Sequence, residues 1–140
     1  AIPVDNISEN LPKMDAVTLH CPKNDETTNL FTKKEFNLMK KSSFIINCAR
    51  GGILNEEDLY EALKNENISG AGLDVFDVEP TPSSNPLFKL NNVILSPHIA
   101  GVTVESTVRM ATETVQNVLD VLDDKVNQSV VINNKEIGMK

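Results

Sequence analysis

The chain has 140 residues, of which 40% are apolar and 24% are charged, a balance typical of a globular domain with a hydrophobic core. Lys and Arg number 13 against 20 Asp and Glu, and the net charge of −7, without any basic cluster, argues against a nucleic-acid partner. No apolar run approaches the ~18 residues that a membrane span requires, and two cysteines, Cys21 and Cys48, are too few for a disulfide framework, so we expect a cytoplasmic protein that does not cross a membrane.

The first third of the chain predicts a strand, a helix and a second strand. Residues 16–19 form a short apolar run, and Pro22, which has no backbone N–H, is expected to end the strand. Thr32 and Glu35 have the spacing of a capping box, which predicts a helix from there to about Lys40. Residues 44–49 are almost continuously apolar, as in a strand that is buried on both faces of a parallel sheet.

The middle of the chain predicts another helix, another strand and a loop. Asn55 is expected to cap a helix in which Leu59, Tyr60 and Leu63 share one side. Residues 71–76 form the next predicted strand. The prolines within residues 79–86 exclude a helix or an inner strand, so this segment is expected to be a loop.

The last part predicts a fourth strand and a long helix. Residues 93–95 are an apolar run that a Ser-Pro pair ends, and residues 130–132 form a short extended segment without a visible partner. Residues 104–123 carry apolar side chains spaced alternately by four and three positions, which predicts a helix with an apolar stripe for packing on a sheet or on a partner helix. The stripe consists of Val104, Val108, Ala111, Val115, Val118 and Leu122.

The alternation of apolar runs and amphipathic stretches predicts an α/β fold with a parallel sheet and covering helices. In such a sheet, ligands bind beyond the carboxyl ends of the strands. The polar residues at or just after these ends are His20, Arg50, Asp74 and His98, with Glu79 five positions after Asp74. Each alone has a structural explanation, such as a hydrogen-bonded histidine or a turn-capping aspartate. Their coincidence at one sheet edge favours a functional site.

Arg50, Glu79 and His98 have the chemistry for reducing an anionic 2-oxo acid. An arginine fork binds a carboxylate through two parallel hydrogen bonds, and a histidine can give or take a proton near neutral pH. A carboxylate beside that histidine favours the imidazolium and fixes the orientation of the ring. No side chain supplies a hydride, so a nicotinamide cofactor is expected. The Gly-x-Gly-x-x-Gly turn for a dinucleotide's pyrophosphate is absent, and Gly51-Gly52 is only a weak phosphate-binding signal.

Other kinds of site are not indicated. The two histidines and two cysteines lack the spacing of a zinc site, so no metal is expected. The Gly-x-Ser-x-Gly turn of many hydrolases does not occur. Cys21 and Cys48 are expected to be small, buried and inert thiols.

Four segments resemble the D-isomer-specific 2-hydroxyacid dehydrogenases. They are residues 15–22 (DAVTLHCP), 46–52 (INCARGG), 70–80 (GAGLDVFDVEP) and 96–101 (SPHIAG). They occur in the order and at the separations of the family, and the resemblance covers nearly the whole chain. It implies a Rossmann-like parallel sheet with NAD as the cofactor. Among the branches of the family, the chain looks most similar to the phosphoglycerate and the hydroxypyruvate/glyoxylate branches, with a preference for the first.

The resemblance also implies a role for each matching residue. Arg50 would bind the carboxylate and carbonyl of the substrate, His98 would protonate the 2-oxo group, and Glu79 would pair with His98. Asp74 would lie at the nicotinamide end of the cofactor. The residues implied to bind the cofactor are His20, Cys21, Pro22, Asn47, Cys48, Ala49, Arg50, Asp74, His98, Ala100 and Gly101.

A complete member of the family also has a substrate domain and a Gly-rich βαβ unit ahead of the matching region. Residues 1–133 would therefore be the C-terminal part of the NAD-binding domain, lacking the first βαβ unit, and residues 134–140 a tail leading towards the substrate domain. The parent protein would be an NAD-dependent enzyme that acts on a small anionic D-2-hydroxy or 2-oxo acid, and a homodimer or higher homo-oligomer. Two alternatives are an NAD(H)-sensing, co-repressor-like protein on the same scaffold and a catalytically inactive fragment.

Overall fold

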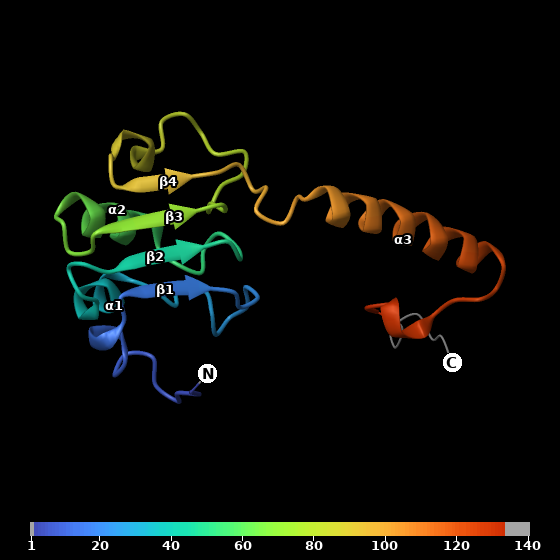
Figure 1. Ribbon diagram of the computed structural model, residues 1–140, viewed down its shortest axis with the longest axis horizontal. Helices are drawn as coiled ribbons and strands as arrows, with labels where there is room; N and C mark the ends of the chain where they lie inside the picture. Colours follow the sequence, from blue (N-terminus) through green and yellow to red (C-terminus); the bar gives the residue numbers. More distant parts are fainter. Residues whose placement is uncertain (1, 134–140) are drawn as a thin grey trace. The chain divides into compact units, whose positions relative to one another are not determined.

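The computed structural model describes residues 2–133, and its four strands form one parallel sheet in the order β1-β2-β3-β4 (Figure 1). The strands are β1 (Ala16–Leu19), β2 (Phe44–Asn47), β3 (Gly70–Leu73) and β4 (Val93–Leu95). Each strand pairs with the strand before it in the sequence, so all four carboxyl ends lie along one edge of the sheet. The predicted α/β class, with a Rossmann-like parallel sheet, is confirmed.

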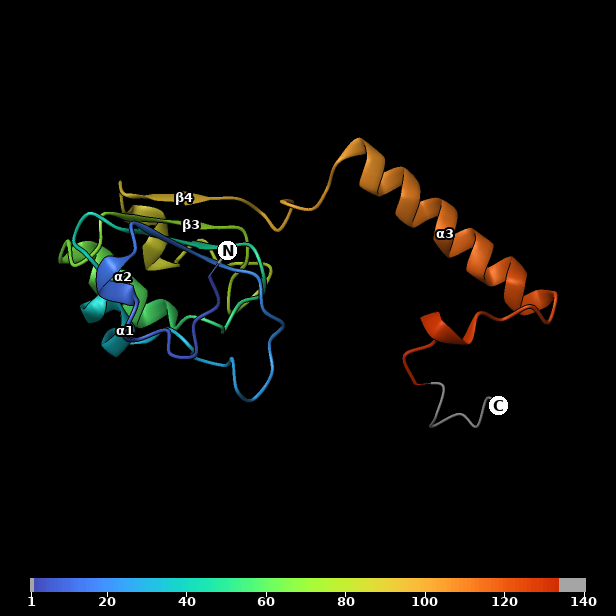
Figure 2. The same cartoon turned by 60° about the horizontal axis from the view of Figure 1, so that its bottom comes forward.

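Two helices cover one face of this sheet. The helices α1 (Lys33–Leu38) and α2 (Glu56–Lys64) join consecutive strands and lie on the same side (Figures 1 and 2). A 3-10 turn at Pro86–Lys89 lies in the connection from β3 to β4. The core contains alternate strand residues together with side chains of both helices, among them Leu19, Ile45, Leu73, Phe36, Leu59 and Leu63. On the opposite face, Phe44 and Ile94 are exposed.

The local sequence explains where the two helices begin. At α1, the N–H and the hydroxyl of Thr32 both donate to Glu35 Oε2, at 3.1 and 2.7 Å, and Asn55 Oδ1 accepts from the N–H of Asp58 at α2. Both predicted helix starts are confirmed. The helix α1 ends at Leu38 rather than near Lys40, because the N–H of Met39 bonds to the carbonyl of Phe36 and the chain then becomes extended.

Two predicted strands are shorter than expected. The strand β2 ends at Asn47 instead of residue 49, because the side chain of Asn47 accepts from the N–H of Ala49 and turns the chain. The strand β3 covers Gly70–Leu73 instead of residues 71–76. Beyond it, the N–H of Phe76 donates to the carboxylate of Glu79 rather than to a neighbouring strand.

A second compact unit begins at Gly101, directly after the first unit ends at Ala100. It contains α3 (Val104–Leu122), whose first turn is capped by Thr103 through the N–H of Ser106. None of the residues of α3 is buried, so the predicted apolar stripe is exposed. Residues 128–130 form a 3-10 turn in place of the predicted extended segment, because Asn127 accepts from the N–H of Ser129.

The division of the chain at residue 133 stays a prediction, and the predicted tail of residues 134–140 lies outside the described residues. Among the helices in the described part of the chain, none is long and apolar enough to cross a membrane.

Candidate active site

A cleft of about 800 Å³ lies beyond the carboxyl ends of the first three strands. It is bordered by the segment after β1, the turn after β2 and the loop after β3. The residues that line it are His20, Cys21, Pro22, Lys23, Cys48, Ala49, Arg50, Gly51, Phe76, Asp77, Glu79 and His98. The structure therefore brings together most of the residues singled out from the sequence, including Arg50, Glu79 and His98.

The turn after β2 is built around the buried side chain of Asn47. Its Nδ2 donates to the carbonyl oxygen of Arg50 at 2.9 Å, and its Oδ1 accepts from the N–H of Ala49 at 3.0 Å. Asn47 is only 1% exposed and does not line the cleft. Its two hydrogen bonds hold the turn from the buried side and so place Ala49 and Arg50 at the edge of the sheet.

Gly51 allows this turn to approach the loop after β3. A Cβ atom on Gly51 would lie 1.8 Å from the carbonyl oxygen of Phe76, closer than any side chain permits. A second tie comes from α2, where Glu56 accepts from the N–H of Asp77 and, at 3.0 Å, from Asn85 Nδ2. These contacts hold the loop that carries Glu79 against the turn that carries Arg50.

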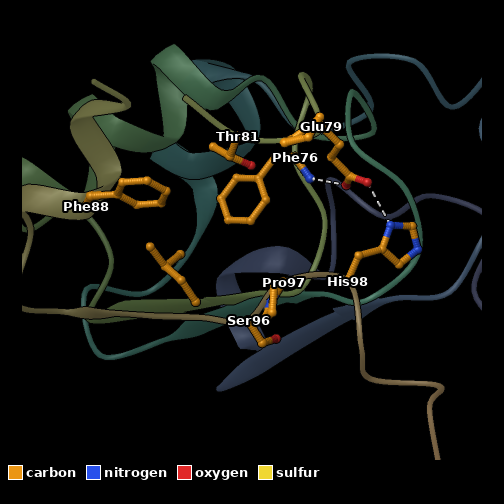
Figure 3. A pocket seen from close by; sticks show the side chains of 9 residues that line it. Phe76, Glu79, Thr81, Phe88, Ser96, Pro97 and His98 are labelled. Atoms are coloured by element: carbon orange, nitrogen blue, oxygen red, sulfur yellow. Dashed lines mark hydrogen bonds and ion pairs between the residues drawn. The ribbon is translucent and has the colours of Figure 1, made fainter. Parts of the chain in front are cut away.

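Glu79 and His98 both line the cleft and form a direct pair, which Figure 3 shows by a dashed line. His98 Nδ1 lies 2.8 Å from Glu79 Oε2, and Glu79 Oε1 accepts from the N–H of Phe76 at 2.9 Å. The hydrogen bond from His98 and then that from Phe76 hold the pKa of Glu79 below its usual range, so the group is a carboxylate near neutral pH. A carboxylate only accepts hydrogen bonds, so Nδ1 of His98 is the donor and Nε2 is the nitrogen that can exchange a proton with a ligand.

Arg50 and His20 are exposed at the cleft. Arg50 Nη1 donates to the carbonyl oxygen of Ala49 at 2.6 Å, which fixes one arm of the guanidinium fork. The ring nitrogen Nε2 of His20 lies 2.8 Å from Thr18 Oγ1. Cys48 is also exposed, so the expectation that both thiols are buried is wrong for Cys48, while Cys21 is half-buried. Cys48 directly follows the last residue of β2, in the turn at the edge of the sheet rather than within the buried strand.

Besides Asn47, three other predicted cofactor residues do not border the cleft. Asp74 is buried directly after β3, and Ala100 donates its N–H to the Asp74 carboxylate. Gly101 begins the second unit, in which its carbonyl oxygen accepts from Ser106 Oγ at 2.7 Å.

A second cavity of about 700 Å³ adjoins the pair on its other side and is mainly apolar (Figure 3). Its lining residues are Phe76, Glu79, Pro80, Thr81, Phe88, Leu95, Ser96, Pro97 and His98. Sequence reasoning missed most of them, and it also missed Lys23 and Asp77 in the first cleft. The available signal was position: Lys23 comes directly after Pro22 and Ser96 directly after β4, so both follow the carboxyl end of a strand. Within residues 2–133, no three His, Cys, Asp or Glu side chains gather as metal ligands.

The family model, curated relatives and a solved structure that match this chain point to the same family. Residues 1–100 match the family model described as "D-isomer specific 2-hydroxyacid dehydrogenase, NAD binding domain". The chain is 42% identical over 127 residues to a glyoxylate reductase of Thermofilum pendens, covering 91% of this chain and 37% of that protein. It is 41% identical over 128 residues to a D-3-phosphoglycerate dehydrogenase of Methanocaldococcus jannaschii, covering 91% of this chain and 24% of that protein.

A solved structure resembles this one closely. The D-isomer specific 2-hydroxyacid dehydrogenase of Lactobacillus delbrueckii ssp. bulgaricus, in its NAD-complexed form, superimposes with a TM-score of 0.81 at 31% identity, covering 89% of this chain and 42% of that chain. The chain thus spans well under half the length of the relatives that it matches.

Proposed function

The chain belongs to the D-isomer specific 2-hydroxyacid dehydrogenases, and we propose that it carries the acid–base pair and the nicotinamide end of the cofactor site of an NAD-dependent enzyme. The reaction is hydride transfer between NAD(H) and a D-2-hydroxy acid or its 2-oxo acid. The observation that carries the proposal is the 2.8 Å contact between His98 and Glu79 in the same cleft as Arg50.

The first cleft fits the nicotinamide end of a dinucleotide. Its volume of about 800 Å³ falls within the ~300–1,000 Å³ of small-molecule sites. Gly51, which has no side chain, lets the turn after β2 lie close to the loop after β3 at the cleft. The pyrophosphate-binding turn is not part of these 140 residues, so the residues that hold the cofactor here are those at the ends of β1 and β2. NAD(H), when bound, supplies or takes up the hydride.

The protein residues divide the remaining work between charge and proton transfer. In the reducing direction, the guanidinium of Arg50 binds the carboxylate of the 2-oxo acid. His98, held by Glu79, gives the proton on Nε2 to the carbonyl oxygen, which becomes the hydroxyl of the product. In the oxidising direction, the same nitrogen takes the hydroxyl proton. Glu79 stays ionised throughout and balances the charge of the imidazolium.

The relatives also suggest a substrate, and the cysteines a location in the cell. The relatives are a glyoxylate reductase and a D-3-phosphoglycerate dehydrogenase, so we propose a small 2-hydroxy acid of that kind, with 3-phosphoglycerate among the candidates. Two free cysteines in the described structure support a cytoplasmic location. We also propose that the parent protein is a homodimer or a higher homo-oligomer.

Steady-state oxidation of NADH by the complete gene product that contains this chain tests the proposal, with glyoxylate, hydroxypyruvate and the 2-oxo acid of 3-phosphoglycerate as substrates. We expect turnover with at least one of them. The variant His98→Ala should lower kcat by roughly 100-fold or more, with the KM for NADH nearly unchanged, because only the proton donor is lost. Wild-type kcat in His98→Ala would refute the acid–base role. Silence with every substrate and tight NADH binding would point to a nucleotide sensor instead.

A further inference from the structure

Asp74 lies just past β3 and is only 2% exposed, and its carboxylate accepts hydrogen bonds from one short segment after β4. Its Oδ1 accepts from Ser96 Oγ at 2.6 Å and from the N–H of Ile99 at 2.9 Å. Its Oδ2 accepts from the N–H of Ala100 at 2.8 Å. The carboxylate is therefore hydrogen-bonded to the chain on both sides of His98.

The backbone conformation of His98 needs such hydrogen bonds to hold it. Its φ is 55°, in the left-handed region that residues with a side chain adopt at a cost. A residue stays there only when its surroundings hold it. Ser96 fixes the chain two residues before His98, and Ile99 and Ala100 fix the two residues after it. All three anchors meet on the Asp74 carboxylate.

The charge of Asp74 suits this task. Burial alone would raise its pKa, but the hydrogen bonds from Ser96, Ala100 and Ile99 outweigh burial, so the pKa is lowered and the group is ionised. An ionised carboxylate has acceptor sites on both oxygens and no donor, which matches a set of partners that are all donors. An amide of the same shape could satisfy only one side of this set.

We propose that Asp74 is a positioning residue for His98: through the segment from Ser96 to Ala100 it holds His98 where Nδ1 reaches Glu79. This role is distinct from the cofactor contact that the family resemblance implies, and it rests on the proposed function insofar as His98 is the proton donor. Asp74 acts on the reaction through the geometry of His98, so its loss should affect kcat more than the binding of NADH.

The first experiment uses the 140-residue chain and needs no activity. Backbone NMR spectra of wild type and Asp74→Asn are compared, with hydrogen exchange at Ile99 and Ala100. We expect these two amides to be protected in the wild type and to exchange at least about tenfold faster in the variant, while the amides of α2 stay protected. Unchanged exchange at both positions in a folded variant would overturn the positioning role, whatever the enzyme does.

The second experiment measures kinetics in the complete gene product. Ser96→Ala removes a single hydrogen bond to Asp74 and should lower kcat roughly three- to tenfold with little change in the KM for NADH. Ser43→Ala is the control, because the Ser43 hydroxyl also makes a 2.6 Å bond, to the carbonyl of Lys40, and Ser43 directly precedes β2, at the opposite end of the strands from the site. Ser43 is buried, whereas Ser96 is half-buried. It should leave kcat unchanged.

The outcomes separate the two proposals. A raised KM for NADH with unchanged kcat in Ser96→Ala and in Asp74→Asn would overturn positioning in favour of a cofactor contact alone. A wild-type protein that oxidises no NADH with any 2-oxo acid would refute the proposed function, and the exchange of Ile99 and Ala100 would still decide whether Asp74 holds the segment.

Discussion

His98 shows how the contacts of a histidine with its neighbours fix both its ring and its backbone. Glu79 orients one nitrogen of its ring, and Asp74 fixes the backbone on which the ring stands. Both carboxylates are themselves held by hydrogen-bond donors, the Ser96 hydroxyl and two backbone N–H groups for Asp74, and His98 with one backbone N–H for Glu79, and these contacts lower the pKa of both groups. The site thus has two layers of acceptors, and the inner one is almost completely shielded from water.

The lowered pKa of Asp74 predicts how stability depends on pH. Because the pKa is lower in the folded than in the unfolded chain, the ionised group stabilises the fold above the unfolded value of about 4. This stabilisation is lost as the pH falls through the lower folded value. We expect the difference in the free energy of unfolding between wild type and Asp74→Asn to be full at pH 6 and to shrink steadily below pH 4.

Urea unfolding followed by tyrosine fluorescence measures this difference, because Tyr60 on α2 is the only tyrosine and the sequence has no tryptophan. Ser43→Ala serves as the control, since it removes a buried hydrogen bond that does not titrate. Its destabilisation should be the same at both ends of the pH range. An equally constant difference for Asp74→Asn would contradict the prediction.

At the scale of elements, the site depends on how closely the turn after β2 approaches the loop after β3. Gly51 is the contact point, because its missing side chain leaves room for the carbonyl of Phe76. Helix α2 adds Glu56 as a bridge to the same loop. The positions of Arg50 and Glu79 relative to each other follow from these two contacts rather than from the sheet alone.

Gly51→Ala should therefore destabilise the first unit by at least about 2 kcal/mol, because the new methyl group would overlap the Phe76 carbonyl unless the loop moves. The control is Gly72→Ala within β3, where a Cβ would meet Ile46 at an ordinary 3.8 Å. It should change the free energy of unfolding by no more than about 0.5 kcal/mol. The two variants are compared by urea unfolding, again with Tyr60 as the probe, and equal losses would refute the close-contact argument.

These elements also mark the limit of prediction from sequence. Strand starts, the caps at Thr32 and Asn55 and the long helix follow from apolar runs and local spacing, which a single segment contains. The early ends of β2 and β3 depend on side chains that compete for backbone groups, such as Asn47 and Glu79. The identities of Arg50, Glu79 and His98 came from chemistry and resemblance. The ties from Asp74 and Glu56 join segments about 20 or more positions apart and leave no local pattern.

At the scale of the whole molecule, α1 and α2 cover one face of the sheet of the first unit (Figure 2). The other face has exposed apolar side chains. Parallel sheets are normally covered on both faces. Phe44 and Ile94 lie on the open face, and Ile94 is 79% exposed. Exposed apolar surface of this kind favours association in water.

We expect the 140-residue chain to self-associate with rising concentration, and Ile94→Lys to reduce that association by placing a charge on the open face. Sedimentation velocity or light scattering measures the mean mass of each protein. Val78→Lys is the control, because Val78 is similarly exposed but lies in the loop after β3. A mean mass that Val78→Lys lowers as much as Ile94→Lys would show that net charge, and not the sheet face, governs association.

The sequential strand order also determines the order in which the strands can pair, because the chain emerges from the ribosome amino end first. Each strand pairs with its predecessor, so the sheet can be extended as synthesis proceeds, without waiting for distant segments. The acceptors at Asp74 and Glu79 are made before their donors on Ser96 and His98. During translation, water must therefore solvate both carboxylates until the last strand docks. Formation of the Glu79–His98 pair is then the closing event in the assembly of this unit, and a chain that stops before His98 cannot form it.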